Sequence, residues 1–126
     1  MKLNDLSSEI INAAITVHKE LGPGLLESVY QSCMIFEMFN RKIKVESELM
    51  VPVFYRGIKV HQEGFRIDLL VDDTIIVELK SVDKVQPVHK KQLLTYLRLM
   101  KKPLGLLINF NESKLVEGVT RVASGI

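Results

Sequence analysis

Apolar residues recur at helical spacing in two consecutive segments at the start of the chain. Between Leu6 and Leu21 this spacing predicts a helix with one buried face, and either Ser7 or Ser8 is placed to cap its start. The sequence Leu21-Gly22-Pro23-Gly24 then ends the helix, because glycine and proline together break regular structure. Helical spacing resumes at residues 25–40, which predicts a second helix.

The pattern then changes to an alternation of period two, which is typical of strands. Residues 45–55 predict a long strand that is interrupted at Pro52, because proline removes a hydrogen bond from a ladder. Arg56-Gly57 predicts a hairpin turn into a short strand at residues 58–61. Gly64 predicts a bend before the next strand.

Three later strands are predicted from their apolar residues. Residues 65–71 and 75–80 flank a turn at residues 72–74, and both strands are apolar on both faces. Such runs are typical of central strands that are covered on both sides. Residues 104–110 form another apolar run and predict a further buried strand.

One more helix is predicted between these strands. Residues 89–100 have helical spacing, Pro87 suits the first turn, and the basic residues of Lys101-Lys102-Pro103 suit the end. Residues 116–122 are compatible with either a short strand or a final helix. The order α-α-β-β-β-α-β predicts an α/β sandwich, with a central mixed sheet flanked by helices, in one domain of residues 1–126.

Composition narrows the class of protein. The 126 residues are 47% hydrophobic and 25% charged, which is typical of a soluble globular domain, and a net charge of +2 is too small to identify a partner. A single cysteine excludes an internal disulfide, and the three histidines are too far apart in sequence for a zinc motif. The start of the chain does not resemble a signal peptide, and no apolar run reaches the roughly 20 residues of a membrane helix. We therefore expect a cytoplasmic protein with no membrane partner.

Three charged residues stand inside the apolar central strands: Asp68, Glu78 and Lys80. A buried charge costs several kcal/mol unless it has a partner, a metal ion or access to solvent. Glu78 and Lys80 are two positions apart, so both point to one face of their strand. The alternative interpretation of this pair is a solvated face with an ordinary salt bridge.

The length of the turn at residues 72–74 decides whether Asp68 joins this pair. A two-residue loop would put Asp68 and Glu78 on opposite faces, whereas a three-residue loop pairs Val71 with Ile75 and puts Asp68 opposite Glu78. We predict the three-residue loop, or a bulge with the same effect, because aspartate tolerates the left-handed conformation that such loops use. Facing carboxylates repel unless a cation lies between them, and their oxygens suit Mg²⁺ or Mn²⁺.

Three motifs resemble one nuclease superfamily. Asp68, followed after nine intervening residues by Glu78-Leu79-Lys80, resembles the core signature of the PD-(D/E)XK nucleases, although no proline precedes the aspartate. Gln92-Leu-Leu-Thr-Tyr96 is similar to the Gln-x-x-x-Tyr element of the RecB-like branch. Gly24-Leu-Leu-Glu27-Ser-Val-Tyr30 resembles the motif that names the GxxExxY family of this superfamily. The resemblance extends from Leu6 to Phe110.

This resemblance implies a nuclease that uses Mg²⁺ or Mn²⁺ to hydrolyse nucleic acid, DNA rather than RNA. It implies that Asp68 and Glu78 bind the metal, that Glu27 supplies a further carboxylate, and that Lys80 acts on the attacking water and the phosphate. The alternative is a non-catalytic module that keeps the nuclease fold in order to bind nucleic acid or protein. For so short a domain, a homodimer or a larger complex is a further expectation.

Other polar residues have two interpretations each. Tyr30 either hydrogen-bonds the site or anchors its helix. Gln92 and Tyr96 lie one turn apart on one helix face, and the resemblance implies that they approach the substrate or the metal; a polar helix surface is the alternative for Gln92. A group of basic residues after the Glu-x-Lys strand forms either a solvated helix face or a set of phosphate contacts. These residues are Lys84, His89, Lys90, Lys91, Arg98, Lys101 and Lys102.

Overall fold

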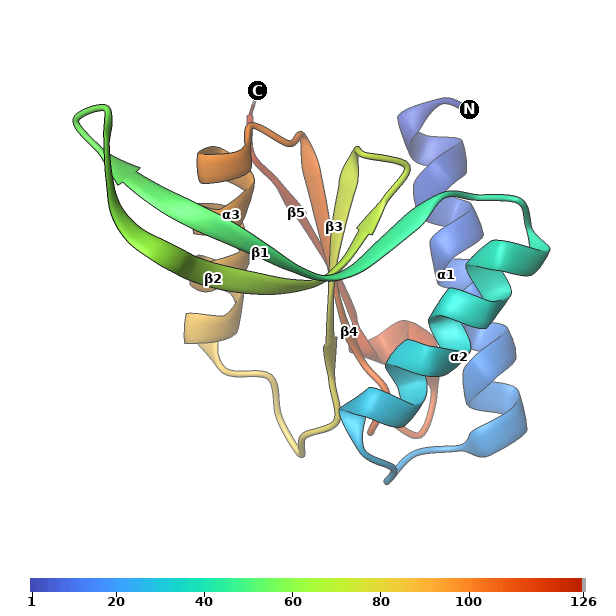
Figure 1. Cartoon of the computed structure of the whole chain (residues 1–126). Helices are drawn as coiled ribbons and strands as arrows, with labels where there is room; N and C mark the ends of the chain where they lie inside the picture. Colours follow the sequence, from blue (N-terminus) through green and yellow to red (C-terminus); the bar gives the residue numbers. More distant parts are fainter. Residues whose placement is uncertain (126) are drawn as a thin grey trace.

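The computed structural model describes residues 1–125, which form a five-stranded sheet with helices on both faces (Figure 1). In chain order the elements are α1 (Leu3–Leu21), α2 (Glu27–Asn40), β1 (Val45–Tyr55), β2 (Ile58–Val71), β3 (Ile75–Lys80), α3 (Pro87–Met100), β4 (Leu104–Asn109), a 3₁₀ turn (Leu115–Gly118) and β5 (Val119–Ala123). The strands lie in the order β1-β2-β3-β4-β5, with β3 and β4 parallel and the other pairs antiparallel. The predicted α/β sandwich with a mixed sheet is confirmed.

Two apolar layers hold the helices on the sheet. Helices α1 and α2 cover one face, where Ile10, Tyr30 and Met34 pack in one cluster with Val77 and other strand residues. Helix α3 covers the opposite face through Leu93 and Leu97. Figure 1 shows this arrangement, with α1 and α2 at the right of the sheet and α3 at the left. Strands β3 and β4 lie between the two layers, which explains why they are apolar on both faces.

The turn between β2 and β3 has the predicted three-residue length. Val71 pairs with Ile75, and both Asp72 and Asp73 adopt the left-handed conformation, with φ of 50° and 55°. The same register pairs Leu69 with Val77. The predicted register of β2 and β3, which depends on this loop, is therefore confirmed.

The predicted cap of the first helix is wrong. Helix α1 begins at Leu3, and Lys2 stands at its N-cap without a side-chain hydrogen bond. Ser7 lies inside the helix with only 3% of its surface exposed. Its hydroxyl donates to the carbonyl oxygen of Asn4 and accepts a hydrogen bond from Arg121 of β5. A tertiary contact therefore accounts for this serine, and the helix begins one turn earlier than predicted.

The predicted interruptions at Pro52 and Gly64 do not divide the strands. Strand β1 continues through Pro52 because it is the edge strand, where a missing N–H costs no ladder bond on the open side. The pairing register shifts beside it. Strand β2 runs through Gly64, whose φ is +59° and whose missing Cβ avoids a collision with the carbonyl oxygen of Val51. Glycine thus permits a close approach of two strands there.

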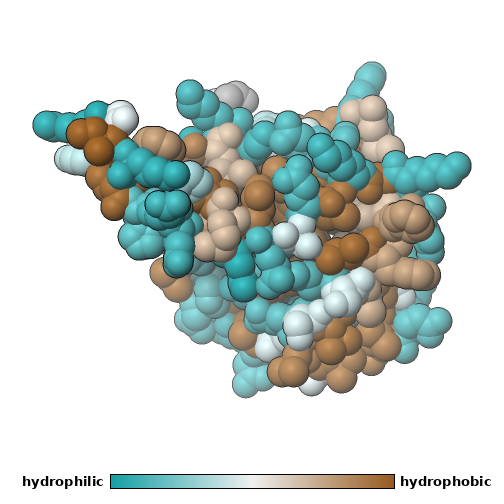
Figure 2. Space-filling view, viewed as in Figure 1, coloured by the Kyte–Doolittle hydropathy of each residue, from teal (hydrophilic) through white to brown (hydrophobic). Residues whose placement is uncertain are grey.

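The outer part of the β1–β2 hairpin, residues 51–65, projects beyond the rest of the molecule and is called the arm below (Figure 1). Figure 2 shows the arm at the left, with hydrophilic and apolar side chains intermixed on its surface. At the other end of the chain, the strand alternative is confirmed for residues 119–122, which form most of β5 and add a final strand to the predicted order. Residues 116–118 belong to the 3₁₀ turn instead.

Candidate active site

Asp68 of β2 and Glu78 of β3 meet where these two strands stop pairing. Leu69–Val77 is the last regular pair on this side. Beyond it the backbone N–H of Asp68 donates to Glu78 Oε2 at 2.9 Å, and the backbone N–H of Leu79 donates to Asp68 Oδ2 at 2.8 Å. Each carboxylate is therefore fixed by the neighbouring strand. The predicted meeting of these two residues is confirmed.

The environment of Glu78 disfavours its negative charge. The residue is 8% exposed, and its pKa is raised from 4.5 to about 7. Burial is the largest cause and the negative charge of Asp68 the second. The hydrogen bond from the Asp68 backbone and the positive charges of Lys80 and Arg66 act in the opposite direction but do not prevail. The ionised carboxylate thus lies in a place that favours an additional positive charge.

The two carboxylates fit a hard divalent cation. Asp68 Oδ1 and Glu78 Oε1 form no hydrogen bond with any residue in the range 1–125. Free carboxylate oxygens are the ligands that Mg²⁺ and Mn²⁺ prefer, and a cation beside them would offset both causes of the raised pKa of Glu78, its burial and the charge of Asp68. Within the described part of the chain, no group of three Asp, Glu, His or Cys side chains is placed to hold a metal ion. The described residues therefore supply two carboxylates for a metal ion rather than three.

Lys80 ends β3 on the same strand face as Glu78, whereas Leu79 points into the α1–α2 layer. Lys80 is partly buried, and its ammonium group forms no ion pair with the described residues. Its charge nevertheless acts on Glu78 by lowering the pKa of that carboxyl. A cation without a fixed partner beside two carboxylates is available for an anionic ligand.

Asn109 fixes the loop that follows Lys80, and sequence reasoning missed it. The residue is fully buried and is paired with Lys80 across the parallel strands. Its Oδ1 accepts hydrogen bonds from the backbone N–H groups of Val82 and Asn111 at 3.1 and 3.2 Å, and its Nδ2 donates to the carbonyl oxygen of Val82 at 2.9 Å. The signal in the sequence was a single amide at the end of an apolar run.

Glu27 lies at the same end of the sheet, at the first residue of α2. Its exposed carboxylate accepts a hydrogen bond from the backbone N–H of Ser81 at 3.3 Å. The hydroxyl of Ser81 donates to the carbonyl oxygen of Leu25 at 2.6 Å. These two bonds bring the start of α2 to the residue that follows Lys80. Glu27 is thus placed beside the end of β3, but it does not complete a cluster of three carboxylates.

Tyr30 holds the loop that leads to Glu27. Its side chain is fully buried and stacks on Phe110 with ring centroids 4.3 Å apart. Its hydroxyl donates to the carbonyl oxygen of Gly22 at 2.6 Å and accepts a hydrogen bond from the backbone N–H of Leu25 at 3.1 Å. These contacts support the anchoring alternative for Tyr30.

Tyr96 of α3 faces the carboxylates. Its ring stacks on Phe65 of β2 with centroids 4.2 Å apart. Its pKa is raised, first by burial and then by the negative charges of Glu78 and Asp68. Gln92, one turn earlier, is exposed and forms no hydrogen bond with the described residues. The helix therefore presents Tyr96 to the site and leaves the amide of Gln92 available.

Two members of the predicted basic group have structural roles. His89 accepts a hydrogen bond from the backbone N–H of Gln86 at 3.0 Å and so completes the capping box of α3. Lys102 contacts Asp73 in the β2–β3 turn, with an Nζ–Oδ1 distance of 3.2 Å. Lys84, Lys90 and Lys91 are exposed.

Comparison with known proteins agrees with this geometry. The model of the PD-(D/E)XK nuclease superfamily matches residues 4–122. Searches of curated proteins and of solved structures gave no significant match. None of the helices within residues 1–125 has the length and apolar character needed to cross a membrane. The match spans nearly the whole chain and includes the strands that carry Asp68, Glu78 and Lys80, so the chain belongs to the PD-(D/E)XK nuclease superfamily.

Proposed function

We propose that this protein hydrolyses phosphodiester bonds in nucleic acid, DNA rather than RNA, with the help of Mg²⁺ or Mn²⁺. One observation carries the proposal: two carboxylates meet across β2 and β3, each fixed through one oxygen and free at the other. Membership of a nuclease superfamily supports the same reaction. We also propose that the Gly24–Tyr30 motif places the protein in the GxxExxY branch and that it acts in the cytoplasm.

Each site residue has a role in this proposal. Asp68 and Glu78 would hold the metal through their free oxygens, and the exposed carboxylate of Glu27 would be a further ligand. When bound, the divalent ion makes water easier to deprotonate and offsets charge on a phosphate. Lys80 orients the attacking water and stabilises the negative charge that develops on the phosphate oxygens.

Helix α3 contributes the side chains that position the substrate. The hydroxyl of Tyr96 lies near enough to Asp68 and Glu78 for their charges to raise its pKa, so it is placed to donate a hydrogen bond to a phosphate or to the metal shell. The exposed amide of Gln92 extends this surface by one helical turn. Tyr30 has an indirect role, since it holds the loop before Glu27.

The proposal is tested by cleavage of labelled single-stranded and double-stranded DNA and RNA in Mg²⁺, Mn²⁺ or EDTA. We expect cleavage of DNA in either metal and none in EDTA. Glu78→Gln and Lys80→Ala are expected to abolish cleavage, whereas Glu63→Gln, an exposed carboxylate on the arm, is the matched control and is expected to leave it unchanged. Cleavage that persists in both site variants would refute the proposal.

The alternative is a module that binds nucleic acid or protein without cleaving it. It is favoured by one observation: the described residues bring together two carboxylates rather than three. Binding of DNA without cleavage in any metal, unaffected by Asp68→Asn, would support this alternative. Size-exclusion chromatography of the same samples tests whether the protein acts as a homodimer or in a larger complex.

A further inference from the structure

An exposed ion pair lies next to the carboxylates, at the base of the arm. Arg66 Nη1 is 3.1 Å from Glu48 Oε1, and the two side chains are 54% and 57% exposed. Arg66 stands two residues before Asp68 on β2, between two residues that pack in the α3 layer, so its side chain points to the other face of the strand. Its positive charge nevertheless acts on Glu78 across the point where β2 and β3 separate. Two carboxylates and two cations therefore lie close to one another where β2 and β3 separate.

Glu48 has an unusual backbone for its position. Its φ is 49°, in the left-handed region that residues with a Cβ rarely adopt. The ladder is regular on both sides of it, with Ser47 paired to Leu69 and Leu49 paired to Ile67. Neighbouring pairs thus hold Glu48 in this conformation beside Asp68. Strained residues of this kind are concentrated at functional sites.

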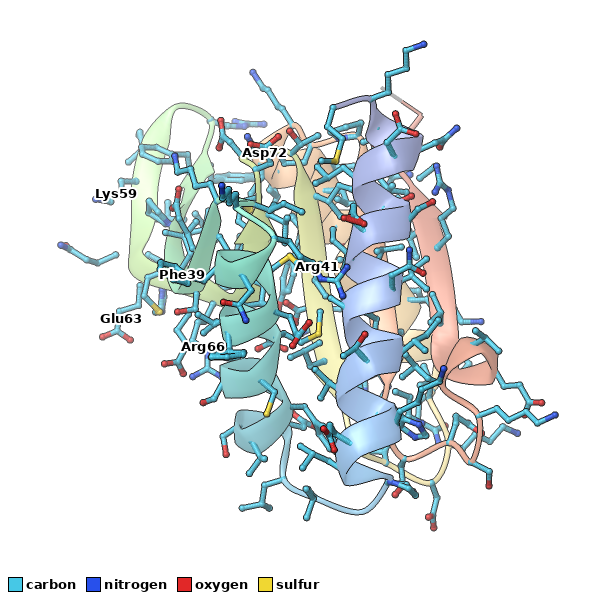
Figure 3. The ribbon with its side chains drawn as sticks, turned by 90° about the vertical axis from the view of Figure 1, so that its right-hand side faces the viewer. Phe39, Arg41, Lys59, Glu63, Arg66 and Asp72 are labelled. Atoms are coloured by element: carbon cyan, nitrogen blue, oxygen red, sulfur yellow. The ribbon has the colours of Figure 1, made fainter. Side chains whose placement is uncertain are left out.

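Folding stability does not account for this arrangement, because exposed ion pairs contribute little to it. The guanidinium of Arg66 has five N–H donors, and Glu48 is its one hydrogen-bond partner among residues 1–125. The planar fork of arginine matches two oxygens of a phosphate. Figure 3 shows Arg66 on the same side of the molecule as Lys59 and Glu63, away from α1 and accessible from outside.

We propose that Arg66 binds a phosphate of the nucleic acid next to the one that is cleaved, and that Glu48 holds the guanidinium in place until that phosphate replaces its carboxylate. This inference rests on the proposed function, because it assigns a contact to the same substrate. The carboxylate and the phosphate compete for one cation. Loss of Arg66 and neutralisation of Glu48 therefore have opposite effects on binding.

The test measures the Kd of a fluorescent DNA duplex by anisotropy, in EDTA to prevent cleavage, over a series of salt concentrations. Arg66→Ala is expected to weaken binding about tenfold and to reduce the salt dependence by about one phosphate contact. Arg66→Lys keeps the charge and is expected to retain the salt dependence with an intermediate Kd. Glu48→Gln is expected to tighten binding roughly threefold, since an amide competes less well than a carboxylate for the guanidinium. The double variant is expected to match Arg66→Ala.

A second exposed ion pair, at the start of β1, is the matched control. Lys44 Nζ is 3.7 Å from Glu46 Oε1, and Lys44→Ala and Glu46→Gln are expected to change neither Kd nor its salt dependence beyond the small effect of net charge. Thermal unfolding checks that every variant is folded. If Arg66→Ala and Glu48→Gln shift the Kd in the same direction, or if neither shifts it, the pair is structural and the inference is overturned. If the parent protein neither binds nor cleaves nucleic acid, the proposed function fails as well as the inference about Arg66. That outcome is distinguishable from failure of the inference alone, in which the parent still binds nucleic acid.

Discussion

Replacement of Glu78 by glutamine is predicted to stabilise the protein at neutral and alkaline pH. The folded state raises the pKa of this carboxyl from 4.5 to about 7, so it holds the proton more tightly than the unfolded chain does. The ionised form therefore destabilises the fold: the cost is absent below about pH 4.5, grows as the pH rises to 7 and is complete above it. A change of one in pKa corresponds to about 1.4 kcal/mol, so the difference between 4.5 and about 7 amounts to about 3 kcal/mol of unfolding free energy.

The assay is urea or thermal unfolding in EDTA between pH 5 and 8.5. The parent protein and Glu78→Gln are expected to differ little in their free energy of unfolding near pH 5, because protonated glutamic acid and glutamine are both neutral and similar in shape. The difference is expected to grow to about 3 kcal/mol above pH 7, or roughly 10 °C in Tm. Glu63→Gln, at an exposed position, is expected to follow the parent at every pH.

Two results would contradict the prediction for Glu78→Gln. A difference between parent and Glu78→Gln that is the same at pH 5 and pH 8 would show that the charge of Glu78 has no part in it. A parent that is more stable than the variant at pH 8 in EDTA would show that burial and Asp68 do not disfavour the ionised carboxylate.

Three further predictions follow from the same contacts. Mn²⁺ is expected to raise the Tm of the parent more at pH 8 than at pH 6, because the proton of Glu78 must leave before a metal binds, and Glu78→Gln should abolish this increase in thermal unfolding. Tyr30→Phe removes two buried hydrogen bonds and is expected to lower the free energy of unfolding by about 1–3 kcal/mol in urea titrations, and to reduce cleavage through the loop before Glu27. Asp68→Asn is expected to abolish metal-dependent cleavage with little loss of stability, whereas Asp68→Ala also leaves the N–H of Leu79 unpaired and should cost a further 1–3 kcal/mol, roughly, in the same titrations.

The central part of the site could be predicted because its determinants are local. Apolar runs on both sides of the turn identified two central strands, and two aspartates that tolerate positive φ fixed a loop of three residues. Register in an antiparallel pair follows from the loop, and the faces of Asp68 and Glu78 follow from the register. Few other steps were needed, which is why this part of the prediction agrees with the structure.

The rest of the site depends on contacts that no local pattern encodes. Glu27 reaches the end of β3 because Ser81 bonds to it and to Leu25, across more than 50 positions of sequence. The error at Pro52 arose because sequence does not show that β1 is an edge strand. The strained backbone of Glu48 is imposed by strand pairs on either side of it, and no periodicity in the sequence predicts it.

The carboxylates of the site have a structural function as well as a chemical one. Where β2 and β3 separate, the N–H groups of Asp68 and Leu79 would lack partners, and the side chains of Glu78 and Asp68 supply them. A separation of the strands is what makes room for two acidic side chains, and the side chains in turn make the separation tolerable. One oxygen of each carboxylate is committed to this task, so one oxygen of each is left for a ligand. Loss of activity in an alanine variant would therefore not distinguish a metal ligand from a strand clamp. Asparagine and glutamine keep the acceptor oxygen and remove the charge, so they separate the two functions.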